Sequence, residues 1–159
     1  MILIVDDKEE NIFSLKKLLE SNRFPVDTAL SGEEALKKAF HNSYFLIILD
    51  VQMPEMDGFE VAEVLMGLDR TRDIPIIFLS AVNTGTKFIT KGYESGGIDY
   101  VTKPVDPEIL LLKIRTFYRL YEQTTSLKLT ENALRREIEV RQKAQLSLKK
   151  EIDNLHLTL

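Results

Sequence analysis

Short apolar runs alternate with segments of helical periodicity across residues 1–120, and no other feature of the chain restricts its fold as strongly. Five of these runs, rich in aliphatic residues, are the predicted strands. Strands that alternate with helices form a parallel sheet, because each helical crossover returns the chain to the same end of the sheet. The pattern therefore predicts an α/β fold, a doubly wound five-stranded parallel sheet with helices on both faces. The predicted strands are ILIVDD (2–7), PVDTAL (25–30), YFLIILD (44–50), PIIFLSA (75–81) and DYVTK (99–103).

Capping residues indicate where several of the helices begin. Ser31 precedes one helical segment, and Glu34, three residues further on, predicts a capping box. Asp106 is the expected N-cap of the last helix, because Pro107 suits the first helical position, where a missing N–H costs nothing. The predicted helices span 9–22, 32–42, 59–69, 86–96 and the stretch that starts at Pro107.

Polar side chains stand where four of the five predicted strands end. Because the carboxyl ends of parallel strands share one edge of a sheet, where ligands bind in such folds, we expect these side chains to meet. Three carboxylates in one place repel one another unless a cation neutralises them. Mg²⁺ suits such a site, because it binds few protein oxygens and keeps waters that a phosphate can replace. The residues are Asp6 and Asp7 after the first strand, Asp50 after the third, Ser80 after the fourth and Lys103 after the fifth.

A phosphoryl group is the anion that this set of side chains suits. Asp50 can attack phosphorus as a carboxylate nucleophile. Lys103 can pair with one phosphoryl oxygen, and the Ser80 hydroxyl can donate to another. Such a reaction depends on positioning and electrostatics more than on covalent chemistry by the protein.

Four motifs occur in a characteristic order: VDD, LDVQMPEMDG, FLSA and YVTKP. Together they make residues 1–120 resemble the receiver domain of bacterial two-component response regulators. The resemblance implies a flavodoxin-like sheet with strand order 2-1-3-4-5. It also implies that Asp50 accepts a phosphoryl group from a sensor histidine kinase or a phosphotransfer protein. Beyond self-phosphorylation and slow self-dephosphorylation, we expect no enzyme activity from this chain.

The same resemblance assigns further residues around the site. Asp7 and Asp50 would bind Mg²⁺ directly, Asp6 would act partly through water, and the backbone carbonyl of Gln52 would be a further ligand. Lys103 and Ser80 would contact the phosphoryl group.

The resemblance also implies a conformational switch. Ser80 would move toward the phosphoryl group, and Tyr100 would swing inward behind it. The face made by the fourth helix, fifth strand and fifth helix would then change shape. The Lys103–Pro104 peptide bond is expected to be cis.

The last part of the chain has neither glycine nor proline after Pro107, which predicts one long helix. A 3–4 spacing of mostly apolar residues, here called the seam, predicts a coiled coil over 121–159, continuous with the fifth receiver helix. A partner helix is needed to bury it, and we expect a parallel homodimer in which Glu131, Arg141 and Gln145 set the register. The seam is Phe117, Leu120, Thr124, Leu127, Glu131, Leu134, Ile138, Arg141, Gln145, Leu148, Ile152, Leu155 and Leu159.

The helical region also bears on the parent protein. Its sequence resembles the signalling helices that join receivers to PAS, histidine-kinase or diguanylate-cyclase modules. Leu159 falls within the seam pattern and not at a stop signal. We therefore expect the N-terminal part of a hybrid sensor histidine kinase, with a diguanylate cyclase as the alternative.

Three other functions are weighed against the receiver. A phosphatase that forms an aspartyl phosphate, as haloacid-dehalogenase enzymes do, carries D-x-D on its first strand, whereas VDDK lacks the second spaced acid. A dinucleotide-binding domain needs G-x-G-x-x-G after that strand, where DDKEEN has no glycine. A pure coiled-coil adaptor would keep signalling after Asp50→Ala.

Composition restricts the cellular location of the chain and the kinds of partner and site that it can have. No apolar run approaches the roughly 18 residues of a membrane span, and Met1 leads into an apolar strand without the basic region of a signal peptide. The net charge of −4 gives no reason to expect nucleic-acid contact. Cysteine is absent, which excludes disulfides and thiolate metal sites. We expect a cytoplasmic protein without membrane contacts.

Overall fold

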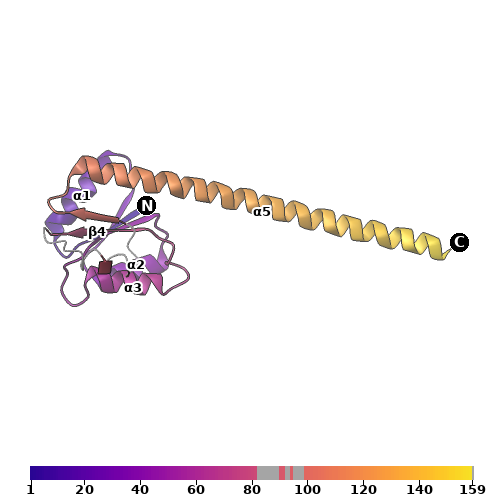
Figure 1. Ribbon diagram of the computed structural model, residues 1–159, viewed down its shortest axis with the longest axis horizontal. Coiled ribbons are helices and arrows are strands. Elements are labelled where there is room, and N and C mark those ends of the chain that lie inside the picture. Colours follow the sequence, from indigo (N-terminus) through magenta and orange to yellow (C-terminus); the bar gives the residue numbers. More distant parts are fainter. Residues whose placement is uncertain (82–89, 92–93, 95–98, 159) are drawn as a thin grey trace. The chain divides into compact units, whose positions relative to one another are not determined.

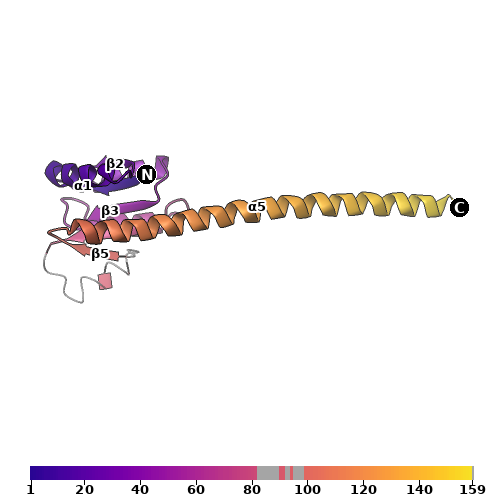
Figure 2. The same ribbon diagram turned by 90° about the horizontal axis from the view of Figure 1, so that it is seen from above.

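The computed structural model describes residues 1–81, 90–91, 94 and 99–158, so most of the helix predicted at 86–96 lies outside the described residues. Within them, five strands form one parallel sheet in the order β2-β1-β3-β4-β5, as predicted. Figure 2 shows β2, β3 and β5 in that order across the sheet. The strands are β1 (Ile2–Val5), β2 (Val26–Ala29), β3 (Leu46–Asp50), β4 (Ile76–Ser80) and β5 (Asp99–Thr102). The helices are α1 (Glu9–Ser21), α2 (Gly32–His41), α3 (Gly58–Met66) and α5 (Pro107–Leu157).

Helices cover both faces of the sheet. Figure 1 shows α2 and α3 on one face, with α1 and the first turns of α5 on the other. Each face has its own apolar core, one built on Phe59, Leu65 and Phe78 and the other on Leu19 and Ile114. Every residue of the central strands β1, β3 and β4 is buried, as expected for parallel strands packed on two sides.

The register of the strands decides which residues meet at the carboxyl edge. Val5 pairs with Leu49, the residue before Asp50. Asp50 in turn lies opposite Leu79, so the acid that ends β3 adjoins the end of β4. Ser80 pairs with Thr102, which precedes Lys103. One continuous register therefore brings the ends of four strands to the same place.

Polar contacts join the edge strand β2 to α2 and to Tyr44, which lies two residues before β3. The Tyr44 hydroxyl donates to Asp27 Oδ2 at 2.6 Å, and Lys38 Nζ lies 3.0 Å from Asp27 Oδ1. Burial alone would raise the pKa of Asp27, but the hydrogen bonds from Tyr44, Lys38 and the Thr28 N–H outweigh it and lower this pKa. The ionised form of Asp27 therefore stabilises the fold.

Replacing Tyr44 by Phe should cost about 1.5 kcal/mol of unfolding free energy near neutral pH, because a hydrogen bond to a charged carboxylate is lost. A lowered folded-state pKa contributes stability that is complete above the ordinary value of 3.8 and is lost as pH falls through the folded-state pKa. The cost of Tyr44→Phe should therefore shrink on acidification. Urea unfolding at several pH values measures it, and a cost unchanged down to the lowest pH would contradict this role of Asp27.

Helix capping follows the predictions with one correction. Asp106 Oδ1 accepts the backbone N–H groups of Glu108 and Ile109, as expected of an N-cap. Ser31 accepts the Glu34 N–H at 3.1 Å, but the Glu34 carboxylate accepts the Leu30 N–H instead of closing the predicted box. The complete capping box belongs to α3, where Asp57 and Glu60 bind each other's backbone N–H groups.

The chain divides into two compact units, Met1–Tyr118 and Arg119–Leu159. The second unit is the remainder of α5, and its side chains are exposed as far as they are described. No helix among the described residues is long and apolar enough to cross a membrane. The predicted division into 1–120 and a coiled coil at 121–159 stays a prediction.

Candidate functional site

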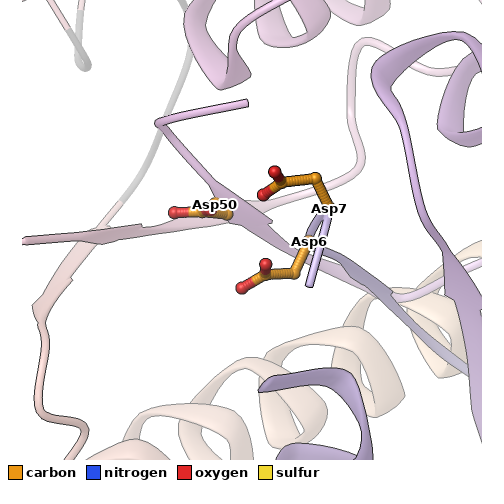
Figure 3. A group of neighbouring side chains, drawn as sticks. All are labelled: Asp6, Asp7 and Asp50. Carbon is orange, nitrogen blue, oxygen red and sulfur yellow. The ribbon is translucent and has the colours of Figure 1, made fainter. Parts of the chain in front are cut away.

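Three carboxylates converge at the carboxyl edge of the sheet (Figure 3). Asp6 and Asp7 directly follow β1, and Asp50 is the last residue of β3. One carboxylate oxygen from each lies within 4.8 Å of the others. Asp6 and Asp50 are buried and Asp7 is partly buried. The predicted meeting of the strand-end acids is therefore present in the fold.

Lys103 places its ammonium group between two of these acids. Its Nζ lies 3.2 Å from Asp6 Oδ2 and 3.2 Å from Asp50 Oδ1. The Lys103 N–H donates to the carbonyl of Ser80 at 2.7 Å, which fixes the end of β5 against the end of β4. One ammonium among three carboxylates leaves two negative charges uncompensated, so the site favours a divalent cation.

The surroundings of the site raise the pKa values of both Asp50 and Lys103. Burial and the nearby Asp6 charge raise the pKa of Asp50, although Lys103 and the Gln52 N–H oppose them. Burial lowers the pKa of Lys103, but the charges of Asp50 and Asp6 outweigh it and leave that pKa raised. The protonated form of Lys103 is therefore favoured, whereas burial and the Asp6 charge disfavour ionisation of Asp50.

Hydrogen bonding differs sharply between the two acids that follow β1. Asp6 is fully used, because Oδ1 accepts the Lys8 N–H at 2.9 Å and Oδ2 accepts from Asn11 at 3.0 Å and from Lys103. Asp7 Oδ1 is buried, and no partner for it is found among the described residues. A buried carboxylate oxygen without a donor is costly unless a cation binds it. With oxygen donors alone, the residues present fit Mg²⁺.

Two residues that the sequence analysis did not assign to the site support it. Asn11, in the first turn of α1, orients Asp6. Gly58 starts α3 and donates its N–H to the Val51 carbonyl at 2.9 Å. A Cβ atom at Gly58 would lie 2.4 Å from the Asp50 carbonyl oxygen. Only glycine therefore allows α3 to begin this close to the end of β3.

The other predicted residues lie where the strand order puts them. Ser80 is buried, and its hydroxyl donates to the Ala81 carbonyl at 3.0 Å. Tyr100 is partly buried, with its ring centroid 5.4 Å from that of Phe78. Gln52 is exposed and follows β3 by two residues. The roles predicted for these three side chains stay predictions, whereas the Lys103–Pro104 bond is cis as expected.

Two cavities lie near the site, one of them lined by Asp6. A cavity of about 320 Å³ is lined by Asp6, Asn11 and Lys103 among others. A second, of about 460 Å³, is lined by residues that include Gln52 and Met53. Open space therefore remains next to Asp6 and Lys103, and next to Gln52, at this rim of the sheet.

Comparison with known proteins places this site in a family. Residues 2–115 match the family described as response regulator receiver domain. The chain belongs to this family. The receiver resemblance drawn from the four motifs is thereby confirmed, and the acidic pocket of this receiver is consistent with phosphoacceptor function. Receivers of this family are in general signalling modules and not catalysts.

Relatives extend the match to proteins of several kinds. The chain is 40% identical over 124 residues to the transcriptional regulatory protein SrrA of Staphylococcus aureus, covering 78% of this chain and 50% of SrrA. Among solved structures it is similar to the chemotaxis protein CheY4 of Vibrio cholerae, with 31% identity and a TM-score of 0.69. The match covers 73% of this chain and 96% of the CheY4 chain. It is also similar to the receiver domain of a signal transduction histidine kinase from Syntrophus aciditrophicus. The sequence identity is 32% and the TM-score 0.68, and the match covers 73% of this chain and 87% of that one. The chain spans about half the length of the curated relatives it matches.

Proposed function

We propose that this receiver takes a phosphoryl group onto Asp50, in a Mg²⁺-dependent reaction, from a phosphohistidine of a sensor histidine kinase or phosphotransfer protein. The observation that supports this most is the cluster of Asp6, Asp7 and Asp50. The Lys103 ammonium group lies beside Asp6 and Asp50, and Asp7 Oδ1 lacks a partner among the described residues.

In the proposed step, a carboxylate oxygen of Asp50 attacks phosphorus in line with the phosphohistidine nitrogen. A P–O bond forms as the P–N bond breaks, and the imidazole leaves with the electron pair and takes up a proton. Lys103 holds Asp50 in place before the step, with Nζ 3.2 Å from Oδ1. It then pairs with a phosphoryl oxygen, and the Ser80 hydroxyl donates to another.

Asp7, Asp50 and the Gln52 carbonyl would hold Mg²⁺ directly, and Asp6 would act partly through water. Both Asp6 oxygens already accept hydrogen bonds, which supports the indirect role. When bound, the ion supplies positive charge that offsets the charge on the phosphoryl oxygens.

The switch and the output complete the proposal. Turning the Ser80 hydroxyl from the Ala81 carbonyl to the phosphoryl group would free space that Tyr100 fills, and the face that includes β5 and α5 would change. The seam of α5 would carry the change as a homodimer. We propose a cytoplasmic parent protein, either a response regulator or a hybrid histidine kinase, since receivers of both kinds are similar to this chain. A diguanylate cyclase is the alternative output.

Incubation with acetyl phosphate and Mg²⁺ tests the proposed reaction directly. The intact mass should rise by one phosphoryl group, and chelation of Mg²⁺ should abolish the gain. A gain that is equal with and without Mg²⁺ would overturn the metal-dependent reaction.

Asp7→Asn should raise the Mg²⁺ concentration for half-maximal phosphorylation by about tenfold or more, because an anionic oxygen ligand is lost. Titration of Mg²⁺ at fixed acetyl phosphate measures this shift. Glu9→Gln is the matched control, since Glu9 is an exposed acid two residues away in α1. An equal effect of both substitutions would mean that Asp7 acts only through general charge.

A further inference from the structure

The central seam of α5, from Leu120 to Ile152, is exposed along its whole length. Its apolar members are exposed large hydrophobic residues: Leu127 is 70% exposed, Leu134 54%, Ile138 53% and Leu148 58%. Two charged residues interrupt it, the acid Glu131 and the base Arg141, which stand ten positions apart. An apolar helix face of this kind needs a partner helix, and the two charges restrict which partner fits.

We infer that the seam binds the seam of a second copy of this chain in the antiparallel direction, in a register centred on Arg136. This inference deepens the homodimer of the proposed function and rests on it. In this register Glu131 of each copy faces Arg141 of the other. Both charges that enter the interface are then paired with the opposite charge.

The parallel arrangement places identical residues opposite each other. Glu131 would then face a second Glu131, and Arg141 a second Arg141, so that two like-charge layers lie in the interface. Like charges placed opposite each other are destabilising, and more so as burial removes water. Residues on either side of a parallel seam can form salt bridges between the two helices, between positions five apart in the sequence. Here no such pair joins an acid to Lys or Arg, so these residues do not offset the repulsion. These flanking pairs are Gln123–Lys128, Thr130–Arg135, Glu137–Gln142, Ala144–Lys149 and Glu151–His156.

The antiparallel register that pairs the charges also aligns the rest of the seam. Shifting it by one heptad in either direction would set Glu131 against Leu134 or Leu148 instead. Charge pairing therefore selects this register. Its layers are Leu120 with Ile152, Thr124 with Leu148, Leu127 with Gln145, Glu131 with Arg141, and Leu134 with Ile138.

At the centre of this arrangement, Arg135 would face its own counterpart, and so would Glu137. Each has an opposite charge in its own helix, but these are pairs with Glu131 and Arg141 that exist in either direction and so do not distinguish the two arrangements. Arg135 Nη2 lies 3.0 Å from Glu131 Oε1, and Arg141 Nη2 lies 2.7 Å from Glu137 Oε1. With the second copy added, the four residues of both helices form a network in which each acid has a base beside it.

Single cysteines introduced into this chain test the direction of the helices, because its 159 residues contain none. Leu120→Cys and Ile152→Cys are purified separately, one with an affinity tag that changes its mass, then mixed and oxidised in a glutathione buffer. The antiparallel register predicts disulfides between the two variants. Disulfides within each variant, and none between them, would overturn the inference and leave the dimer of the proposed function standing. Val140→Cys, outside the seam, is the control and should not join either variant.

Charge exchange tests the pairing itself by sedimentation equilibrium. Glu131→Arg should weaken the dimer about tenfold or more, because two acid–base pairs become base–base pairs. Adding Arg141→Glu to it should restore the affinity. A dimer that Glu131→Arg leaves unchanged would overturn the antiparallel register. A chain that stays monomeric at every concentration would overturn both the inference and the dimeric output, while phosphorylation of Asp50 remains a separate measurement.

Discussion

Asp50→Asn should reduce phosphorylation by acetyl phosphate more than about 10³-fold, because the amide removes the attacking carboxylate oxygen while keeping the shape of the side chain. The intact mass of the protein, followed over time with Mg²⁺ present, measures the loss. Asp57→Asn is the matched control, since Asp57 lies seven residues further on, and Asn is as good an N-cap for α3. The control should phosphorylate like the natural chain.

The same Asp50 substitution should leave the fold intact or make it more stable. Burial and the Asp6 charge oppose ionisation of Asp50, as its raised pKa indicates, and a neutral amide removes this repulsion. The contact with Lys103 is weakened in return. Thermal unfolding should therefore show no large decrease in Tm. A variant that fails to phosphorylate because it unfolds would give no support to a nucleophilic Asp50, whereas an intact and inert variant would.

Gly58→Ala should damage both stability and phosphorylation, although Gly58 has no side chain to offer a ligand. Its Cβ atom would lie 2.4 Å from the Asp50 carbonyl oxygen and 2.9 Å from the Val51 Cα, and backbone atoms cannot turn away as a flexible side chain can. We expect a loss of about 3 kcal/mol of unfolding free energy. Displacement of Asp50 by a fraction of an ångström to an ångström should slow phosphorylation by about 10²-fold.

Gly67→Ala is the control for Gly58→Ala. The nearest atoms to a Cβ at Gly67 lie 3.5 Å and 3.6 Å away, and its backbone is in the ordinary helical region with φ −72°. Alanine there should be neutral or should stabilise the protein by about 0.5 kcal/mol. Urea unfolding of both variants checks the pair. Similar stabilities would mean that the close approach of α3 to β3 does not require glycine.

Much of the site could be predicted because it depends on where strands end. Asp6, Asp7, Asp50 and Lys103 each follow an apolar run, and a parallel sheet brings such positions to one edge without further information. The distances between these side chains depend on the strand order and register. The alternation of strands and helices does not determine these by itself, and the family resemblance was needed to predict the strand order.

The sequence was less informative where an element's role depends on its neighbours. The capping-box pattern occurs at both Ser31 and Asp57, and only the path of the preceding residue decides whether the acid closes the box. Asn11 looked like any polar residue of α1 until the fold set its amide 3.0 Å from Asp6. The close contact of Gly58 with Asp50 likewise has no signal in the sequence, because it depends on two elements meeting in space.

The seam presents a different difficulty. Its spacing predicts a partner helix, but the apolar residues alone do not distinguish parallel from antiparallel pairing. The direction of pairing is indicated by the two charged residues, Glu131 and Arg141. It emerges only when the residue opposite each charge is identified for the parallel and for the antiparallel arrangement.

Chemical mapping of the phosphorylated residue tests the central claim most directly. After incubation with Mg²⁺ and acetyl phosphate, borohydride reduces an aspartyl phosphate to homoserine, and peptide mass spectrometry locates the change. The account predicts homoserine at position 50, in proportion to the phosphoryl group gained. Reduction at another acid, or a stable phosphoryl group that borohydride does not reduce, would contradict it.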